Sequence, residues 1–183
     1  PFEVRSFRFQ FPADLLTSWA SEMEILILGW YILVETGSVL LLTIYGALQY
    51  LGTLIAPVFG LAGDRFGHRN VLCTMRVIYT GLASLLTVLS LMHVVTPVVV
   101  FCIATVSGLI RPSDLAMRNA LVAETMPGDR LMAAMGVART TSDSARVVGS
   151  LAGAALFALL GMGWAYLAVA AFYGIGYGLT LGV

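Results

Sequence analysis

The chain is organised as six long apolar runs, each separated from the next by a few polar or flexible residues. A helix needs roughly 20 mostly apolar residues to cross the hydrocarbon core of a bilayer, and each run has about that length. The pattern predicts an all-α membrane protein with six transmembrane helices at residues 9–34, 38–61, 71–92, 95–122, 131–160 and 164–182. The sequence shows no linker or low-complexity tract, so we expect residues 1–183 to form one six-helix transmembrane bundle.

The connections between the expected spans alternate in character. Residues 35–37 and 161–163 form short turns, whereas residues 63–70 and 124–130 carry charge. The arginines outside the spans all fall on the side of the charged connections: Arg5, Arg8, Arg65, Arg69 and Arg130. Glu35 and His93 fall on the other side. Because cytoplasmic loops are enriched in Lys and Arg, we expect a multi-pass protein of the cell (inner) membrane whose N-terminus is cytoplasmic.

The composition agrees with a lipid environment. Hydrophobic residues make up 59% of the chain and charged residues 11%, which is unlike a soluble domain. Ten arginines balance ten acidic residues without any lysine, so the net charge of zero gives no basis for nucleic-acid binding. Cys73 and Cys102 lie in apolar stretches without histidines nearby, which predicts free thiols and no metal site.

Catalytic patterns are weak in this sequence. It has no His-rich cluster, no nucleophile beside a base and no phosphate-binding glycine loop. An enzyme is therefore the class that the sequence supports least, and we expect no cofactor.

Ionisable residues inside the expected spans are the main functional candidates, because a charge in the hydrocarbon region is costly unless it faces protein or water. Eight of them define a candidate substrate and proton pathway: Asp14, Glu22, Glu24, Arg111, Asp114, Arg139, Asp143 and Arg146. They belong to the first, fourth and fifth spans. The other three spans carry almost no charge apart from Arg76, which we expect near a membrane face. This segregation predicts a shared water-filled path.

A purely structural role for these charged residues is as well supported as a role in transport. Asp114 with Arg118, and Arg139 with Asp143, are spaced four residues apart. Each pair can therefore neutralise itself within one helix.

Single helices carry three more expectations. Glu22 lies nearest the middle of the membrane and is the favoured proton acceptor, whereas Glu24 points about 160° away around the same helix. Pro112 should bend the fourth span, as in transporters whose helices bend at the substrate site. Gly149 and Gly153 form a small-xxx-small step that lets another helix pack closely.

Residues 60–69, between the second and third spans, read GLAGDRFGHR. This segment resembles the loop 2–3 signature of the major facilitator superfamily, G-x-x-x-D-R-x-G-R-[RK], with His68 in place of a basic residue. The glycines suit close packing and a tight turn, Asp64 can cap the next helix or pair with a cation, and the arginines suit the membrane face, where His68 would anchor less firmly. The resemblance implies a conformational latch formed by Gly60, Asp64, Arg65, Gly67 and Arg69.

The resemblance covers the whole chain and implies one half of a twelve-helix fold, built as a 3+3 inverted repeat and continued after Val183 by a C-terminal six-helix half. Residues 111–130 resemble exporter-type members. The fifth span matches two glycines of an antiporter pattern, Gly149 and Gly153, but lacks its proline. The resemblance thus implies secondary active transport in the lipid bilayer, with proton-coupled efflux of a small amphipathic or lipophilic compound by alternating access. Two alternatives stay open, namely a uniporter or nutrient symporter of the same fold, and a non-transporting six-helix membrane subunit.

Overall fold

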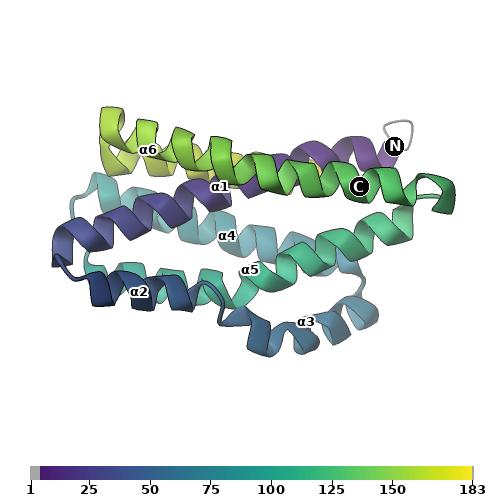
Figure 1. Ribbon diagram of the computed structural model, residues 1–183, viewed down its shortest axis with the longest axis horizontal. Coiled ribbons are helices and arrows are strands. Elements are labelled where there is room, and N and C mark those ends of the chain that lie inside the picture. The colour runs from purple at the N-terminus through teal and green to yellow at the C-terminus, as the bar shows by residue number, and fades with distance from the viewer. Residues whose placement is uncertain (1–4, 183) are drawn as a thin grey trace.

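The protein is helical, as predicted. The computed structural model describes residues 5–182, with every side chain in that range except those of Arg5 and Asp129. The helices are α1 (Arg5–Thr36), α2 (Val39–Leu48), α3 (Gly52–Phe66), α4 (His68–Leu91), α5 (Pro97–Thr125) and α6 (Gly128–Thr180) (Figure 1). They lie roughly along a common axis, as expected for a bundle that crosses a membrane.

Four helical stretches in the described range are long and apolar enough to cross a membrane. They are Val39–Phe66, which joins α2 and α3, then α4, α5, and Arg130–Thr180 within α6. α1 has 32 residues, but Asp14, Glu22 and Glu24 interrupt its apolar sequence. Length and composition therefore give a smaller number of spans than the expected six, and the count of six stays a prediction.

The first part of α6 runs parallel to α1. α6 is a single element of 53 residues, interrupted at Gly161 by a non-helical conformation (φ 79°, ψ 176°). We call residues 128–160 the first arm of α6 and residues 162–180 the second arm. Along the first arm, Gly149 lies against Trp19 and Gly153 lies against Met23. A Cβ atom on Gly153 would be 3.0 Å from the Met23 Cα atom, so the two helices are in backbone contact.

The second arm of α6 runs antiparallel to α1. Here Gly176 lies against Ala13, and Gly182, just beyond the arm, lies against Phe9. Later residues of the second arm therefore contact earlier residues of α1, whereas later residues of the first arm contact later ones. α6 folds back at Gly161, and α1 packs against both arms.

The segment expected as one span at residues 38–61 is divided into two helices. Residues 49–51 form the turn between α2 and α3. A Cβ atom on Gly52 would lie 2.7 Å from the Gly108 carbonyl oxygen of α5, which is closer than such atoms approach, so this contact requires glycine. Pro112 lacks the amide hydrogen that would bond the same carbonyl. The turn thus packs where α5 lacks one backbone hydrogen bond.

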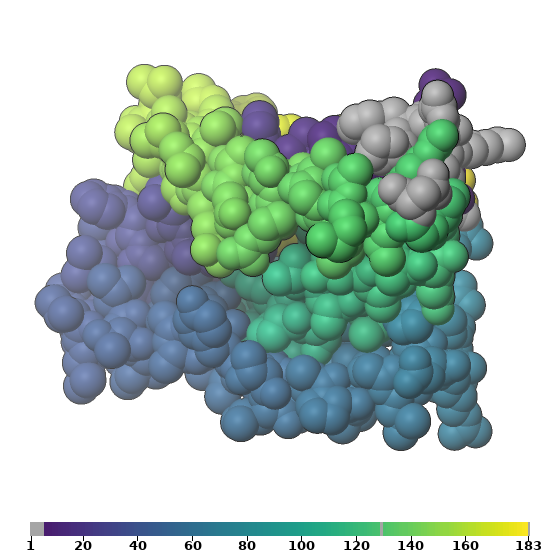
Figure 2. Space-filling view, turned by 45° about the vertical axis from the view of Figure 1, so that its right-hand side comes forward, coloured from purple at the N-terminus to yellow at the C-terminus, as the bar shows by residue number. Residues whose placement is uncertain are grey.

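α1 supplies the centre of the hydrophobic core, and apolar side chains also cover the outside. Met23, Ile27 and Ile32 of α1 are fully buried, while Leu54 is 79% exposed and Leu159 is 81% exposed. In Figure 2, α2 and α3 (blue) and the first arm of α6 (green) border one face, with α5 between them. Large exposed apolar side chains of this kind suit a lipid environment.

One end of the bundle gathers segments that are far apart in the sequence. His68, at the start of α4, contacts Glu124 near the end of α5 at 2.6 Å. Arg69 donates a hydrogen bond of 2.5 Å to the carbonyl of Leu181, which follows α6. The start of α1 lies at the same end (Figure 1). We call it the N-terminal end.

Candidate functional site

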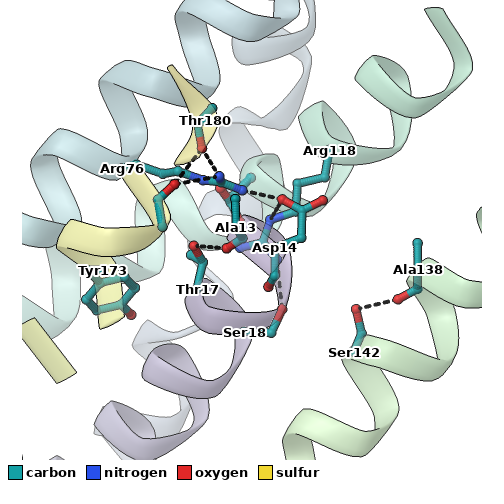
Figure 3. A network of polar contacts seen from close by, with 12 residues as sticks. Ala13, Asp14, Thr17, Ser18, Arg76, Arg118, Ala138, Ser142, Tyr173 and Thr180 are labelled. Atoms are coloured by element: carbon teal, nitrogen blue, oxygen red, sulfur yellow. Dashed lines mark hydrogen bonds and ion pairs between the residues drawn. The ribbon is translucent and has the colours of Figure 1, made fainter. Parts of the chain in front are cut away.

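Asp14 of α1 lies at the centre of an ion-pair network inside the bundle (Figure 3). Its Oδ1 atom is paired with Nη2 of Arg76 in α4, and Nε of Arg118 in α5 lies 3.7 Å from the same oxygen. Arg76 is 0% exposed and also donates to the Thr180 hydroxyl and, at 3.3 Å, to the Gly176 carbonyl of α6. The network therefore connects α1 with α4, α5 and the second arm of α6.

Arg118 brings a second carboxylate into this network. Its Nη2 atom lies 2.5 Å from Oδ2 of Asp114, one turn earlier in α5. Its Nη1 atom donates to the Ser18 hydroxyl at 2.7 Å and to the Asp14 carbonyl at 3.2 Å. Two aspartates thus face two arginines, and the formal charges cancel. Charge balance of this kind reduces the cost of burying ionised groups.

A second buried ion pair lies about 15 Å further along α1, given the rise of the helix per residue. Glu24 is 3% exposed, and its Oε2 atom lies 3.1 Å from Nη2 of Arg111 in α5. The same oxygen accepts a hydrogen bond of 2.8 Å from the hydroxyl of Tyr173 in the second arm of α6. The Tyr173 ring stacks on Tyr79 of α4 at a centroid distance of 5.3 Å. Together with the two tyrosines, this ion pair connects α1, α4, α5 and α6.

Polar atoms near the Glu24–Arg111 pair are left without hydrogen-bond partners among the described residues. They include Nε and Nη1 of Arg111 and the hydroxyls of Tyr79, Tyr166 and Ser107, all of which are buried. Most buried polar groups in proteins have a partner, so a group of unsatisfied ones calls for an explanation such as water, an ion or a ligand. This region has more hydrogen-bonding capacity than the ion pair uses.

The other four candidate residues lie apart from these networks, beside or on the first arm of α6. Arg139 and Asp143 form the expected pair at 3.2 Å, but their side chains are 70% and 51% exposed. Nε of Arg146 lies 3.9 Å from Oε1 of Glu22. The eight candidates thus divide into two groups of four, one buried in the bundle and one on or beside the first arm of α6. Those that enter the interior are Asp14, Glu24, Arg111 and Asp114.

The loop motif forms the tight turn between α3 and α4. Gly67 has φ +86°, a conformation that glycine adopts readily. Asp64 is 76% exposed and lies 3.8 Å from His68, and among the described residues no side chain caps α4. The His68 ring also contacts Glu124. The residue that departs from the family pattern therefore connects the turn to the end of α5.

The remaining motif residues have different surroundings. The Arg65 guanidinium lies 5.6 Å from the ring centroid of Phe66, and Arg69 is bonded to the Leu181 carbonyl. A Cβ atom on Gly60 would meet nothing within 4 Å among the described residues, so packing within this part of the chain does not explain a glycine there.

Several residues of the networks were not among the eight candidates, and they include Arg76, Arg118, Tyr173 and Thr180. Arg76 is the clearest case, because its side chain is fully buried inside the bundle and paired with Asp14. A single arginine in an apolar span was the signal that could have identified it. Thr180 and Tyr173 gave no such signal, since hydroxyl groups are common in membrane helices and their partners are remote in sequence.

The two networks and the α3–α4 turn lie in a segment that matches a known protein family. Residues 12–182 match the family described as the Major Facilitator Superfamily. The chain belongs to the Major Facilitator Superfamily. A search of curated proteins finds no match to it. Members of the Major Facilitator Superfamily are transporters rather than enzymes, so this chain is a multi-pass membrane transporter with a small-molecule substrate.

Proposed function

We propose that this chain is part of a proton-coupled secondary active transporter that exports a small amphipathic or lipophilic compound by alternating access. The main support is the pair of buried ion-pair networks around Asp14 and Glu24 in an otherwise apolar bundle. Stability alone does not require them, because replacing a buried ion pair by apolar groups is often neutral or stabilising. Ionisable groups inside membrane helices commonly mark ion and substrate pathways.

Protons would act by breaking these ion pairs. A proton on Asp14 removes the charge that Arg76 and Arg118 face, and a proton on Glu24 does the same for Arg111. An arginine without its carboxylate is costly in the interior, so each protonation favours a different arrangement of the helices. A substrate that binds better to one arrangement would thereby exchange with the proton.

The burial of Glu24 favours it over Glu22 as a proton-binding residue. Glu24 points into the core and contacts Arg111 and Tyr173. Glu22 is partly exposed and lies near Arg146, at the boundary between α1 and the first arm of α6. A proton on Glu22 would alter a loose surface contact, whereas a proton on Glu24 would alter a contact that joins several helices.

The proposed architecture has six spans related by a 3+3 repeat, namely α1, α2 with α3, α4, α5 and the two arms of α6. α1 can be counted because Asp14 and Glu24 are covered by neighbouring helices and do not face lipid. The N-terminal end, which carries Arg65 and Arg69, would face the cytoplasm at the inner membrane.

The first arm of α6 supports a second six-helix half as partner. Arg139, Asp143 and Arg146 are exposed on a helix of membrane-spanning length, and such charges are unfavourable against lipid. A C-terminal half of the same fold, with a polar cavity between the halves, would cover them. The α3–α4 turn would then act as a latch at the N-terminal end.

A uniporter or nutrient symporter of the same fold is the second candidate. It is favoured by the fact that Asp14, Glu24 and Asp114 each already have an arginine partner, so their charges can serve structure alone. In that case transport would proceed without proton movement.

Inside-out vesicles that contain the full-length protein can separate these candidates. The vesicles are acidified inside, and loss of the gradient is recorded on adding lipophilic cations, anions and neutral compounds, with tetraphenylphosphonium as the first cation. We expect at least one compound to dissipate the gradient in the wild type, and Glu24→Gln to abolish this response. Glu22→Gln should retain it, as should Glu35→Gln, a control on the same helix. Transport of a radiolabelled compound without gradient loss would favour the uniporter.

A further inference from the structure

A small cavity lies beside Asp14, between α1, α5 and the first arm of α6. It has a volume of about 20 Å³. Its polar lining consists of Asp14, Ser18, Arg118, Asn119, Thr141 and Ser142. Figure 3 shows Ser18 and Ser142 on opposite sides of it. A water molecule needs a cavity of at least about 10–15 Å³, so the space suits water and is too small for an organic substrate.

The lining groups suit a ligand that donates hydrogen bonds. The hydroxyl hydrogens of Thr141 and Ser142 are used within α6, where they bond the Val137 carbonyl at 2.8 Å and the Ala138 carbonyl at 3.2 Å. Their oxygens therefore remain as acceptors, next to the Asp14 carboxylate. Water or a hydronium ion can donate to two or more of these oxygens at once.

An open groove leads from the surface towards this cavity. The groove has a volume of about 500 Å³ and follows the boundary between α1 and the first arm of α6. It shares two lining residues with the cavity, Phe11 and Thr141. Thr140 lines the groove but not the cavity. Phe11 and Thr141 thus form the wall between the groove and the space beside Asp14.

We propose that this cavity is a water site that connects Asp14 to the groove and makes Asp14 the carboxylate that exchanges protons with the N-terminal end. A hydronium ion in the site would transfer its proton to Asp14, forming an O–H bond on the carboxylate and leaving a neutral water. Arg118 would keep Asp114 as partner, while Arg76 would lose its carboxylate. Glu24 lines neither the cavity nor the groove. The role of this site in transport rests on the proposed function, but its hydration does not.

Thiol accessibility in membranes tests the water site independently of transport. Cys73 and Cys102 are first replaced by Ser in the full-length protein, and single cysteines are placed by Ser18→Cys and Ser142→Cys. The control is Ala104→Cys, at a buried position of α5 in the hydrophobic core that lines neither space. The probe is Ag⁺, an ion close to water in size. Its reaction is followed as loss of later maleimide labelling in the denatured protein.

We expect both cavity cysteines to react at least about tenfold faster than Ala104→Cys, because a buried thiol must wait for local opening. Adding Thr141→Leu should slow the reaction of Ser142→Cys, while Thr140→Leu should leave it unchanged. If both cavity cysteines react as slowly as Ala104→Cys, the water site is refuted while the proposed function stands. If they react rapidly and vesicles show no proton movement, the water site stands and the proposed function fails.

Discussion

The guanidinium of Arg76 in α4 pairs with the carboxylate of Asp14 in α1, although the two residues are 62 positions apart. The contact fixes α4 against α1 inside the bundle, and Arg118 contacts the same carboxylate oxygen. Asp14 is therefore the common partner of two arginines. Losing this one carboxylate would affect both of them.

Asp14→Asn is expected to be strongly destabilising. It preserves the shape of the side chain but leaves the buried Arg76 without a carboxylate, which typically costs about 3–5 kcal/mol. Unfolding of the purified full-length protein in mixed micelles with increasing dodecyl sulfate gives the change. Glu35→Gln, an exposed acid at the end of α1, should change stability by less than about 0.5 kcal/mol. Equal losses for both variants would contradict a special role of Asp14.

Tyr173→Phe tests the second network. It removes the hydrogen bond to Glu24 and should cost about 0.5–1.5 kcal/mol, or more because the acceptor is charged. Tyr79→Phe is the matched control, since the Tyr79 hydroxyl has no partner among the described residues. We expect this control to be neutral or slightly stabilising in the same unfolding measurement. The reverse order would show that the hydrogen bond from Tyr173 to Glu24 does not stabilise the fold.

Gly153→Ala tests the backbone contact between α1 and the first arm of α6. The added methyl group would lie 3.0 Å from the Met23 Cα atom, so the helices must move apart at a cost of about 1–3 kcal/mol. Gly136→Ala on the same arm meets nothing within 4 Å among the described residues and should stabilise by up to about 1 kcal/mol. Thermal unfolding of the full-length protein in detergent compares the two. Similar stabilisation by both would rule out the close contact.

His68→Ala is expected to loosen the end of α5. It removes the contact with Glu124, so amides near the end of that helix should exchange with deuterium faster. His93→Ala, at the opposite end of the bundle, is the control and should leave those amides unchanged. Unaltered exchange in His68→Ala would show that the bridge has no effect on the helix end.

Asp64→Asn tests the latch. Because Asp64 is largely exposed, the substitution should change stability by less than about 0.5 kcal/mol. If the turn works as a latch between the two halves, transport by the full-length protein should nevertheless fall. Unchanged transport would remove the latch from the account.

The fold class could be predicted from the sequence because the apolar runs are long and the charged residues between them are few. The bend in α6 was expected at residues 161–163, and Gly161 lies there. The break at residues 49–51 was not expected, because it depends on a backbone contact between Gly52 and α5 that sequence periodicity does not reveal.

The site was only partly predictable for a similar reason. Helical geometry placed Glu22 and Glu24 on different faces, but it could not tell which face α1 turns to the core. That choice depends on where α5 and α6 pack, and Glu24 contacts residues of these helices that are 87 and 149 positions away along the chain. The partnership of Arg76 with Asp14 has the same origin.

Proton release on substrate binding is the most direct test of the central claim. The compound that dissipates the gradient in vesicles is added to purified full-length protein in weakly buffered detergent solution, and the released protons are counted with a pH-sensitive dye. The account predicts that binding to the wild type releases protons and that Glu24→Gln, if it still binds the compound, releases fewer. Binding to the wild type without any proton release, at every pH where the protein stays folded, would contradict it.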